Sequence, residues 1–186
     1  MFSGKIGDTL LEGYIEEVIL HLRRLKEIDN VKLLVDEIAS SPHSKIFTYG
    51  VGRSGYIAQA FTMRLMHLGF NAYFVGEPNC PAAEEGDILV VISGSGRTYS
   101  VVNMVKRIRR EGRSIKIVSI GGVGEIGKMS DIHIELDVGE YNREYFPMGT
   151  LFEELAFILL DGVIYLLKER LNISEEEMKR RHCNLL

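Results

Sequence analysis

Cysteines are scarce in this sequence of 186 residues: the chain has two, Cys80 and Cys183, and they lie far apart. Two distant cysteines exclude a disulfide framework and are typical of a protein from a reducing compartment. Neither a C-x-x-C nor an H-E-x-x-H spacing occurs, so the sequence carries no signature of a metal site. We therefore expect a cytoplasmic protein without a metal centre.

Long apolar runs and an excess of basic residues are also absent. No apolar stretch approaches the ~18 residues of a membrane span, and the N-terminus lacks the charged and apolar regions of a secretion signal. The net charge is -4 and the pI is near 5.8, whereas nucleic-acid-binding proteins usually present a basic face. We expect neither a membrane nor a nucleic acid among the partners.

What the sequence does contain is an alternation of short apolar segments with helical segments. The predicted strands are residues 45–49, 72–75, 88–92, 115–120 and 132–136. Strands separated by helices form right-handed βαβ units around a parallel sheet. The pattern predicts an α/β fold, a flavodoxin-like doubly wound sheet of five strands in the order 2-1-3-4-5. The loops after the first and third strands would then meet where the strand order switches.

Helical segments flank this core on both sides. Residues 7–40 carry apolar side chains at helical spacing, with a break predicted at 27–30. This arm packs either on its own domain or on a second subunit. Residues 148–170 predict a long helix that is apolar on more than one face, as in a helix between a sheet and another element, such as a partner's equivalent helix. Ser174 and Glu177 predict a capping box for a last short helix.

We expect these segments to form one domain over residues 1–186. Its predicted parts are a helical arm at 1–42, a βα core at 43–147 and C-terminal helices at 148–186.

The most informative motif is the run from Ser93 to Thr98, which follows the third predicted strand and precedes a helix. In that position, the backbone N–H groups of a glycine-rich loop and the N-terminus of the next helix form a site for an anion. The hydroxyl groups of Ser93, Ser95 and Thr98 add donors. Because such a loop needs no lysine or arginine, it suits one phosphate monoester better than a polyphosphate with its metal ion. The sequence therefore predicts a ligand that carries a phosphate.

Two other glycine-rich segments have competing interpretations. Residues 50–55 match G-x-G-x-x-G after a strand, which indicates either a dinucleotide site or a tight turn that needs glycine. A second phosphate-type loop is not part of the dinucleotide pattern, and the chain is short for a dinucleotide domain plus a substrate domain. Residues 122–128 approach a P-loop, but Met129 replaces the hydroxyl residue that would bind Mg²⁺. We predict a flexible loop there.

Two acids and one histidine remain as candidate catalytic residues. Glu153 and Glu154 begin the long apolar helix. Acids in a first turn commonly only complement the helix dipole, but a partly buried carboxylate could act as a general base. His182 lies near the chain end, where no core demands it, and is either a solvated residue or part of a site. Spacing alone leaves these alternatives open.

Four stretches of the sequence, taken in order, resemble those of a known protein family. They are residues 50–70, 92–98, 147–153 and 181–185. They resemble SIS (sugar isomerase) domains, and among these the 6-phospho-3-hexuloisomerases. The glycine–serine loop is shared by all SIS domains, whereas Met148 to Glu153 and Arg181 to Leu185 are more specific to the hexuloisomerases. The resemblance covers the chain from about residue 45 to its end and, less distinctly, the arm.

The resemblance implies roles for individual residues. Glu153 would be the catalytic acid and base, and His182 a second catalytic group, which we expect to complete the site of a neighbouring subunit. Arg97 departs from the family, because many SIS loops carry glutamate there, and this puts the contacts around the sugar in doubt. The residues predicted to bind the substrate are Gly52, Arg53, Ser54, Ser93, Gly94, Ser95, Gly96, Arg97 and Thr98.

The resemblance also implies an activity. Members of the family interconvert D-arabino-3-hexulose 6-phosphate and fructose 6-phosphate, for which a 2,3-enediol is the intermediate expected. They need no metal or nucleotide cofactor and are typically tetrameric. The alternatives are a SIS-type sensor that binds a sugar phosphate without catalysis, and an isomerase of a different phosphosugar.

Overall fold

Five parallel strands form the centre of the computed structural model, which describes residues 4–25, 30–136, 138–141 and 143–185. The sheet has the order β2-β1-β3-β4-β5, which confirms the doubly wound, flavodoxin-like prediction. β3 is buried at all six positions because it is the central strand, as its unbroken apolar run predicts. The strands are β1 (Lys45–Gly50), β2 (Asn71–Phe74), β3 (Ile88–Ser93), β4 (Lys116–Gly121) and β5 (Ile132–Glu135).

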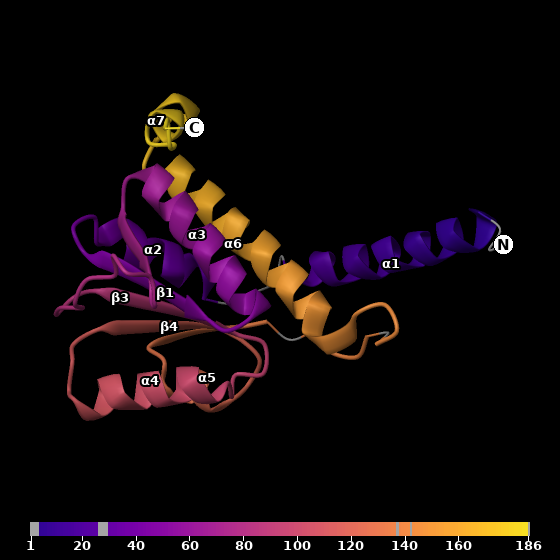
Figure 1. Ribbon diagram of the computed structural model, residues 1–186, viewed down its shortest axis with the longest axis horizontal. Helices are drawn as coiled ribbons and strands as arrows, with labels where there is room; N and C mark the ends of the chain where they lie inside the picture. Colours follow the sequence, from indigo (N-terminus) through magenta and orange to yellow (C-terminus); the bar gives the residue numbers. More distant parts are fainter. Residues whose placement is uncertain (1–3, 26–29, 137, 142, 186) are drawn as a thin grey trace.

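Helices cover both faces of this sheet (Figure 1). α2, α3 and α6 pack with the arm on one face, and α4 and α5 cover the other, so that two apolar clusters lie on either side of the strands. The helices are α1 (Gly4–Arg24), α2 (Val31–Ser40), α3 (Arg53–Leu68), α4 (Tyr99–Arg110), α5 (Glu125–Met129), the 3₁₀ turn η2 (Pro147–Gly149), α6 (Thr150–Arg170) and α7 (Glu175–Arg180).

Helix ends differ from the predictions where the backbone turns left-handed. Met148 (φ 55°) and Gly149 (φ 90°) are not helical, so α6 begins at Thr150 and not at 148. Asn30 (φ 69°) precedes α2, while residues 26–29 of the predicted break lie outside the described part. The capping box of α7 is confirmed, because the Glu177 amide donates to the Ser174 hydroxyl and Glu177 accepts from the Ser174 amide.

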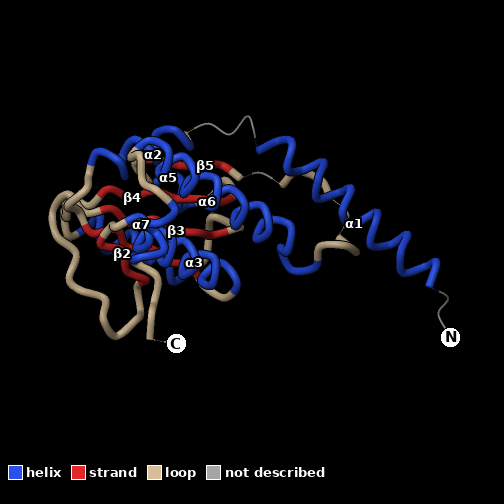
Figure 2. Tube along the Cα trace, turned by 90° about the horizontal axis from the view of Figure 1, so that it is seen from above, coloured by secondary structure: helices blue, strands red, loops and turns tan. Residues whose placement is uncertain are grey.

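The N-terminal helix α1 extends away from the sheet, beyond the start of α6 (Figures 1 and 2). One side of α1 packs on its own chain: His21 is buried and one of its ring nitrogens lies 3.1 Å from the Val138 carbonyl oxygen. Other apolar side chains of α1 remain in solvent. Of the two alternatives for the arm, the contact with its own domain is present, and it uses one side of the helix. The exposed apolar residues are Leu10, Leu11, Ile15, Ile19 and Leu20.

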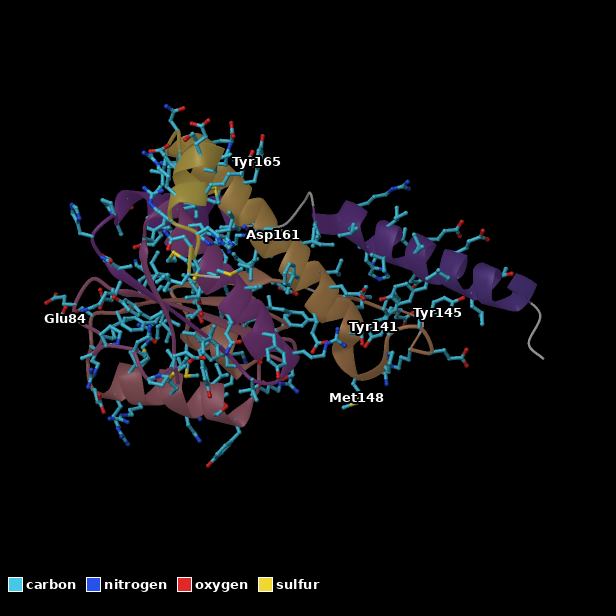
Figure 3. All side chains as sticks on the ribbon, turned by 45° about the horizontal axis from the view of Figure 1, so that its top comes forward. Glu84, Tyr141, Tyr145, Met148, Asp161 and Tyr165 are labelled. Carbon is cyan, nitrogen blue, oxygen red and sulfur yellow. The ribbon has the colours of Figure 1, made fainter. Side chains whose placement is uncertain are left out.

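Helix α6 is also only half covered. Its inner face is buried against α2, α3 and the sheet, while Tyr165 is 60% exposed on the outer side, where Figure 3 shows it beside Asp161. Phe157 and Ile158 share that outer side and are each more than 40% exposed, and Leu166, which lies toward α2, is exposed to a similar degree. None of the helices within the described ranges is long and apolar enough to cross a membrane.

Candidate active site

The loops after β1 and β3 leave the sheet side by side. The two strands are parallel neighbours, with Gly50 paired to Ile92, so both loops emerge at the same carboxyl edge, as predicted. Each loop leads directly into a helix, α3 at Arg53 and α4 at Tyr99. Two helix N-termini therefore lie close together at this edge, where their dipoles favour a bound anion.

The loop from Ser93 to Thr98 presents hydroxyl groups and backbone amides in a fixed arrangement. Ser93 is buried, and its hydroxyl shares a hydrogen bond of 2.8 Å with that of Thr98. The amide of Arg97 donates to the Ser95 hydroxyl over 3.2 Å, and both Arg97 and Ser95 are exposed. Gly96 has φ +61°, a conformation that side chains disfavour.

The segment 121–126 packs against this loop through backbone hydrogen bonds. This contact corrects our prediction of a flexible loop at 122–128. The amide of Gly122 donates to the carbonyl of Gly94 over 3.1 Å, and that of Ile126 to Gly96 over 3.0 Å. A Cβ on Gly96 would lie 2.3 Å from the Gly122 oxygen. The glycines of the P-loop-like run thus let two loops pack backbone to backbone.

Glycines shape the loop after β1 in a similar way. A Cβ on Gly50 would lie 2.6 Å from the carbonyl oxygen of Ser54, so the first glycine serves the tight turn. Gly52 (φ 61°) caps α3, and Ser54 is half-buried in the first turn of that helix. The interpretation of this motif as a tight turn therefore accounts for Gly50, whereas Ser54 lies in the first turn of α3 at the carboxyl edge of the sheet.

Helix α6 brings a carboxylate to the same place. The ring of Phe152 packs against Gly94 so closely that a Cβ there would lie 2.8 Å from it, and Glu153 is the next residue. Arg53 Nε lies 2.9 Å from Glu153 Oε2, and Arg53 Nη1 donates to the Thr150 hydroxyl over 3.2 Å. Arg53 therefore ties the start of α3 to the start of α6.

The environment of Glu153 is that of a proton acceptor more than that of a solvated first-turn acid. Its side chain is 14% exposed. Burial raises the pKa of Glu153, the Arg53 guanidinium lowers it, and the neighbouring Glu154 carboxylate raises it. Arg53 Nε lies within ion-pair distance of Glu153 Oε2, but the contact lacks hydrogen-bond geometry. A mostly buried carboxylate with a raised pKa is suited to accept a proton from carbon.

His182 lies at the far end of the molecule from Glu153. Its ring stacks on that of His67, with centroids 5.2 Å apart, and Arg181 donates to the His67 carbonyl over 3.1 Å. His67 and Arg53 are at opposite ends of α3, about 21 Å apart at 1.5 Å per residue. A single chain therefore does not bring His182 to the other predicted site residues (Figure 1).

The profile of the SIS domain family matches residues 38–157. The chain belongs to the SIS domain family. The "3-hexulose-6-phosphate isomerase" of Methanocaldococcus jannaschii is 48% identical over 153 residues, 82% of each chain. The Bacillus subtilis protein of the same name is 38% identical over 159 residues, 82% of this chain and 84% of the relative.

A solved structure agrees with these sequence relatives. It is a Methanococcus jannaschii protein for which the molecular function of 3-hexulose-6-phosphate isomerase has been inferred, and it is 43% identical with a TM-score of 0.82. The match covers 96% of this chain and 99% of that one. The resemblance to the hexuloisomerases is thus confirmed, and the SIS protein described here is a phosphosugar isomerase.

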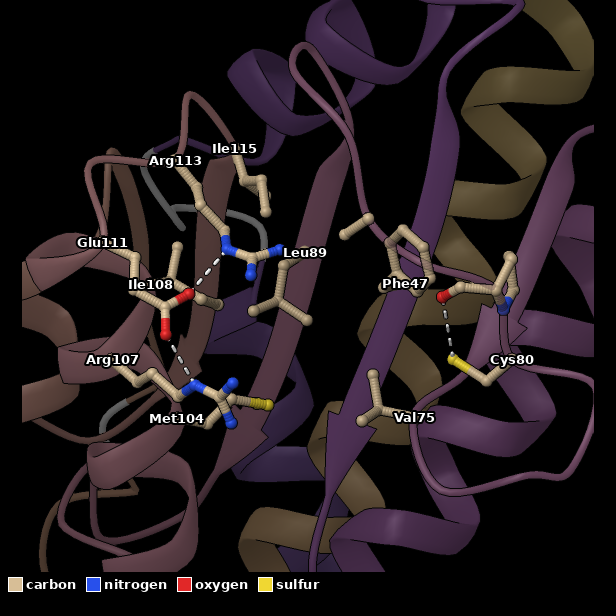
Figure 4. A pocket seen from close by; sticks show the side chains of 12 residues that line it. Phe47, Val75, Cys80, Leu89, Met104, Arg107, Ile108, Glu111, Arg113 and Ile115 are labelled. Atoms are coloured by element: carbon tan, nitrogen blue, oxygen red, sulfur yellow. Dashed lines mark hydrogen bonds and ion pairs between the residues drawn. The ribbon is translucent and has the colours of Figure 1, made fainter.

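The SIS domain also has an apolar pocket that no sequence pattern predicted (Figure 4). It measures about 230 Å³ and lies between β1, β3 and α4, lined among others by Phe47, Leu89 and Met104. The structure describes all of residues 75–87, and they contain no helix where the doubly wound pattern would place one between β2 and β3. The pocket contains none of the predicted site residues.

Proposed function

We propose that the protein interconverts D-arabino-3-hexulose 6-phosphate and fructose 6-phosphate. The observation that carries this proposal is the position of Glu153, a mostly buried carboxylate held next to the phosphate-type loop by Arg53 and Phe152. The identity to two relatives named for this reaction supports the choice of substrate.

The proposed reaction moves the carbonyl group between C3 and C2. Starting from fructose 6-phosphate, Glu153 takes the proton from C3 and a 2,3-enediol forms as O2 gains a proton. O3 then loses its proton as the carbonyl forms there, and Glu153 returns a proton to C2. The loop from Ser93 to Thr98 would hold the phosphate, which orients the sugar and supplies binding energy away from the reacting carbons. No step requires a metal ion.

Solvent exchange tests the reaction directly. We expect the purified protein, incubated with fructose 6-phosphate and a chelator in deuterated water, to produce 3-hexulose 6-phosphate and to place deuterium at C2 or C3. Deuterium at C1 alone would instead indicate an aldose–ketose isomerase acting through a 1,2-enediol. Binding of the sugar phosphate without any exchange would indicate a sensor, and either result overturns the proposal.

We also propose that the protein is a homo-oligomer, with a tetramer expected, in which His182 completes a neighbouring subunit's site. The exposed apolar residues of α1 and α6 support this arrangement, as does the separation of His182 from Glu153 within one chain. There His182 would move protons between the two substrate oxygens or open the fructose ring.

Mixing two inactive variants tests the shared site. Glu153→Gln and His182→Ala should each be inactive alone, but co-expressed chains should recover up to about a quarter of wild-type activity, because randomly paired subunits rebuild intact sites. His43→Ala changes an exposed histidine and should remain active. If the mixed oligomers stay inactive, or if a verified monomer is fully active, the shared site is refuted.

A further inference from the structure

His182 packs on a second histidine, His67, at the end of α3. The two imidazole rings stack, with their planes 18° from parallel and their centroids 5.2 Å apart. His67 is buried, at 3% exposed, whereas His182 is exposed near the end of the chain. The buried ring therefore offers a fixed flat surface to a side chain that would otherwise turn freely in solvent.

Arg181 fixes the backbone next to His182, where α7 packs on the end of α3 (Figure 1). Its guanidinium donates a hydrogen bond of 3.1 Å to the carbonyl oxygen of His67. The same guanidinium packs on Gly69, where a Cβ would lie 3.1 Å from Arg181 Cζ. Met178 of α7 packs against the apolar cluster on the α3 side of the sheet. The segment that carries His182 is thus attached to the domain on both its backbone and its ring.

The stack leaves one nitrogen of the His182 ring available for chemistry. Among the described residues, the ring hydrogen-bonds only to the next residue in the chain, with Nδ1 3.1 Å from the Cys183 carbonyl oxygen. Because a carbonyl oxygen only accepts, Nδ1 carries a proton, and Nε2 is the nitrogen that can face a substrate. Burial lowers the pKa of His67, and the charges of Arg64 and His182 lower it further. The His67 ring is therefore neutral near neutral pH and does not repel a proton on its neighbour.

We propose that His67 is a positioning residue for the isomerase reaction: it orients the His182 ring of its own chain for the site that His182 completes on a neighbouring subunit. The inference rests on the proposed role of His182. Proton transfer at the substrate oxygens needs a ring nitrogen at hydrogen-bond distance and in the right direction. A misplacement of about 1 Å can cost a hundredfold in rate. Stacking on His67 fixes the plane of the ring without occupying Nε2.

Two substitutions of His67 separate ring stacking from the filling of space. His67→Leu fills the buried position without a flat ring, His67→Phe keeps the ring, and both keep the carbonyl that accepts from Arg181. Per folded protein, measured by circular dichroism, kcat should fall by at least about tenfold in His67→Leu and by less than about threefold in His67→Phe. His43→Leu, the same substitution at an exposed histidine, should match the wild type. Wild-type kcat in His67→Leu beside an inactive His182→Ala, or equal losses in the leucine and phenylalanine variants, overturns the inference.

Co-expression tests whether His67 acts through the His182 of its own chain. Mixed with Glu153→Gln, His67→Leu should recover up to about a quarter of wild-type activity, because the Glu153→Gln chain supplies both histidines intact. Mixed with His182→Ala, it should not exceed the activity of His67→Leu alone, because neither chain then holds both. Recovery to about a quarter in this second mixture would show that the two histidines act in different sites, and it overturns the inference. Full activity of His182→Ala alone refutes the proposed role of His182 and the inference with it, and that result needs no variant of His67.

Discussion

Glu153→Gln is expected to lower kcat by about a thousandfold, within the range that general bases contribute. The amide keeps the size of the side chain at the start of α6 but cannot accept a proton from carbon. The phosphate site should persist, because Phe152 still packs on Gly94 and the loop's hydrogen bonds do not involve Glu153. Binding of fructose 6-phosphate should therefore change much less than the rate.

The measurement combines steady-state kinetics with deuterium exchange into fructose 6-phosphate. Glu169→Gln is the matched control, because it makes the same substitution near the other end of α6, where Glu169 is exposed and pairs with Lys168. This control should retain full activity. A Glu153→Gln enzyme with more than a tenth of the wild-type kcat would exclude Glu153 as the base.

Gly96→Ala is expected to have the largest effect on the phosphate site. The alanine would have to adopt φ +61° and place its Cβ 2.3 Å from the carbonyl oxygen of Gly122, so one of the two backbones must move. We expect the free energy of unfolding to fall by about 3 kcal/mol. Because one of these backbones would hold the phosphate and the other is hydrogen-bonded to it, KM should rise by at least about tenfold.

Gly112→Ala separates the conformational strain of alanine at a positive φ from the steric clash between the two loops, which together lower the stability of Gly96→Ala. Gly112 has almost the same φ, +64°, but a Cβ there has no neighbour within 4 Å. Its unfolding free energy should fall by about 1 kcal/mol, the conformational cost alone, with KM unchanged. Urea unfolding at one protein concentration and initial-rate kinetics give both quantities. Equal losses in the two variants would show that the close packing of the loops is unimportant.

The sheet was predictable because its signals are local. Each strand is a short apolar run between glycine or polar turns, and the burial of all six residues of β3 follows from its position at the centre. The convergence of the loops after β1 and β3 follows from the strand order, which the alternation of elements limits to few choices. Family resemblance and not periodicity distinguished Glu153 from Glu154.

The features of the site that the sequence did not predict depend on contacts between distant segments. Nothing at residues 122–126 of the sequence indicates that their backbone packs against Gly94 and Gly96, since glycines at that spacing equally suit a flexible loop. The hydrogen bond from Tyr14 to Glu154 spans 140 residues, and Tyr14 sits in an ordinary helical pattern. The signal that was available is the unusual side-by-side pair of acids at the start of an apolar helix, which needs a partner when it is buried.

Helix α3 runs without interruption from Arg53, its first residue, to His67, on which His182 stacks. The length of α3 therefore fixes the distance between Arg53 and His67. Inserting one residue would rotate everything after it by about 100° and turn His67 away from the chain's C-terminal segment. Relatives of this protein should therefore differ in the length of the connection at 75–87, which contains no helix. The length of α3 should stay constant among them.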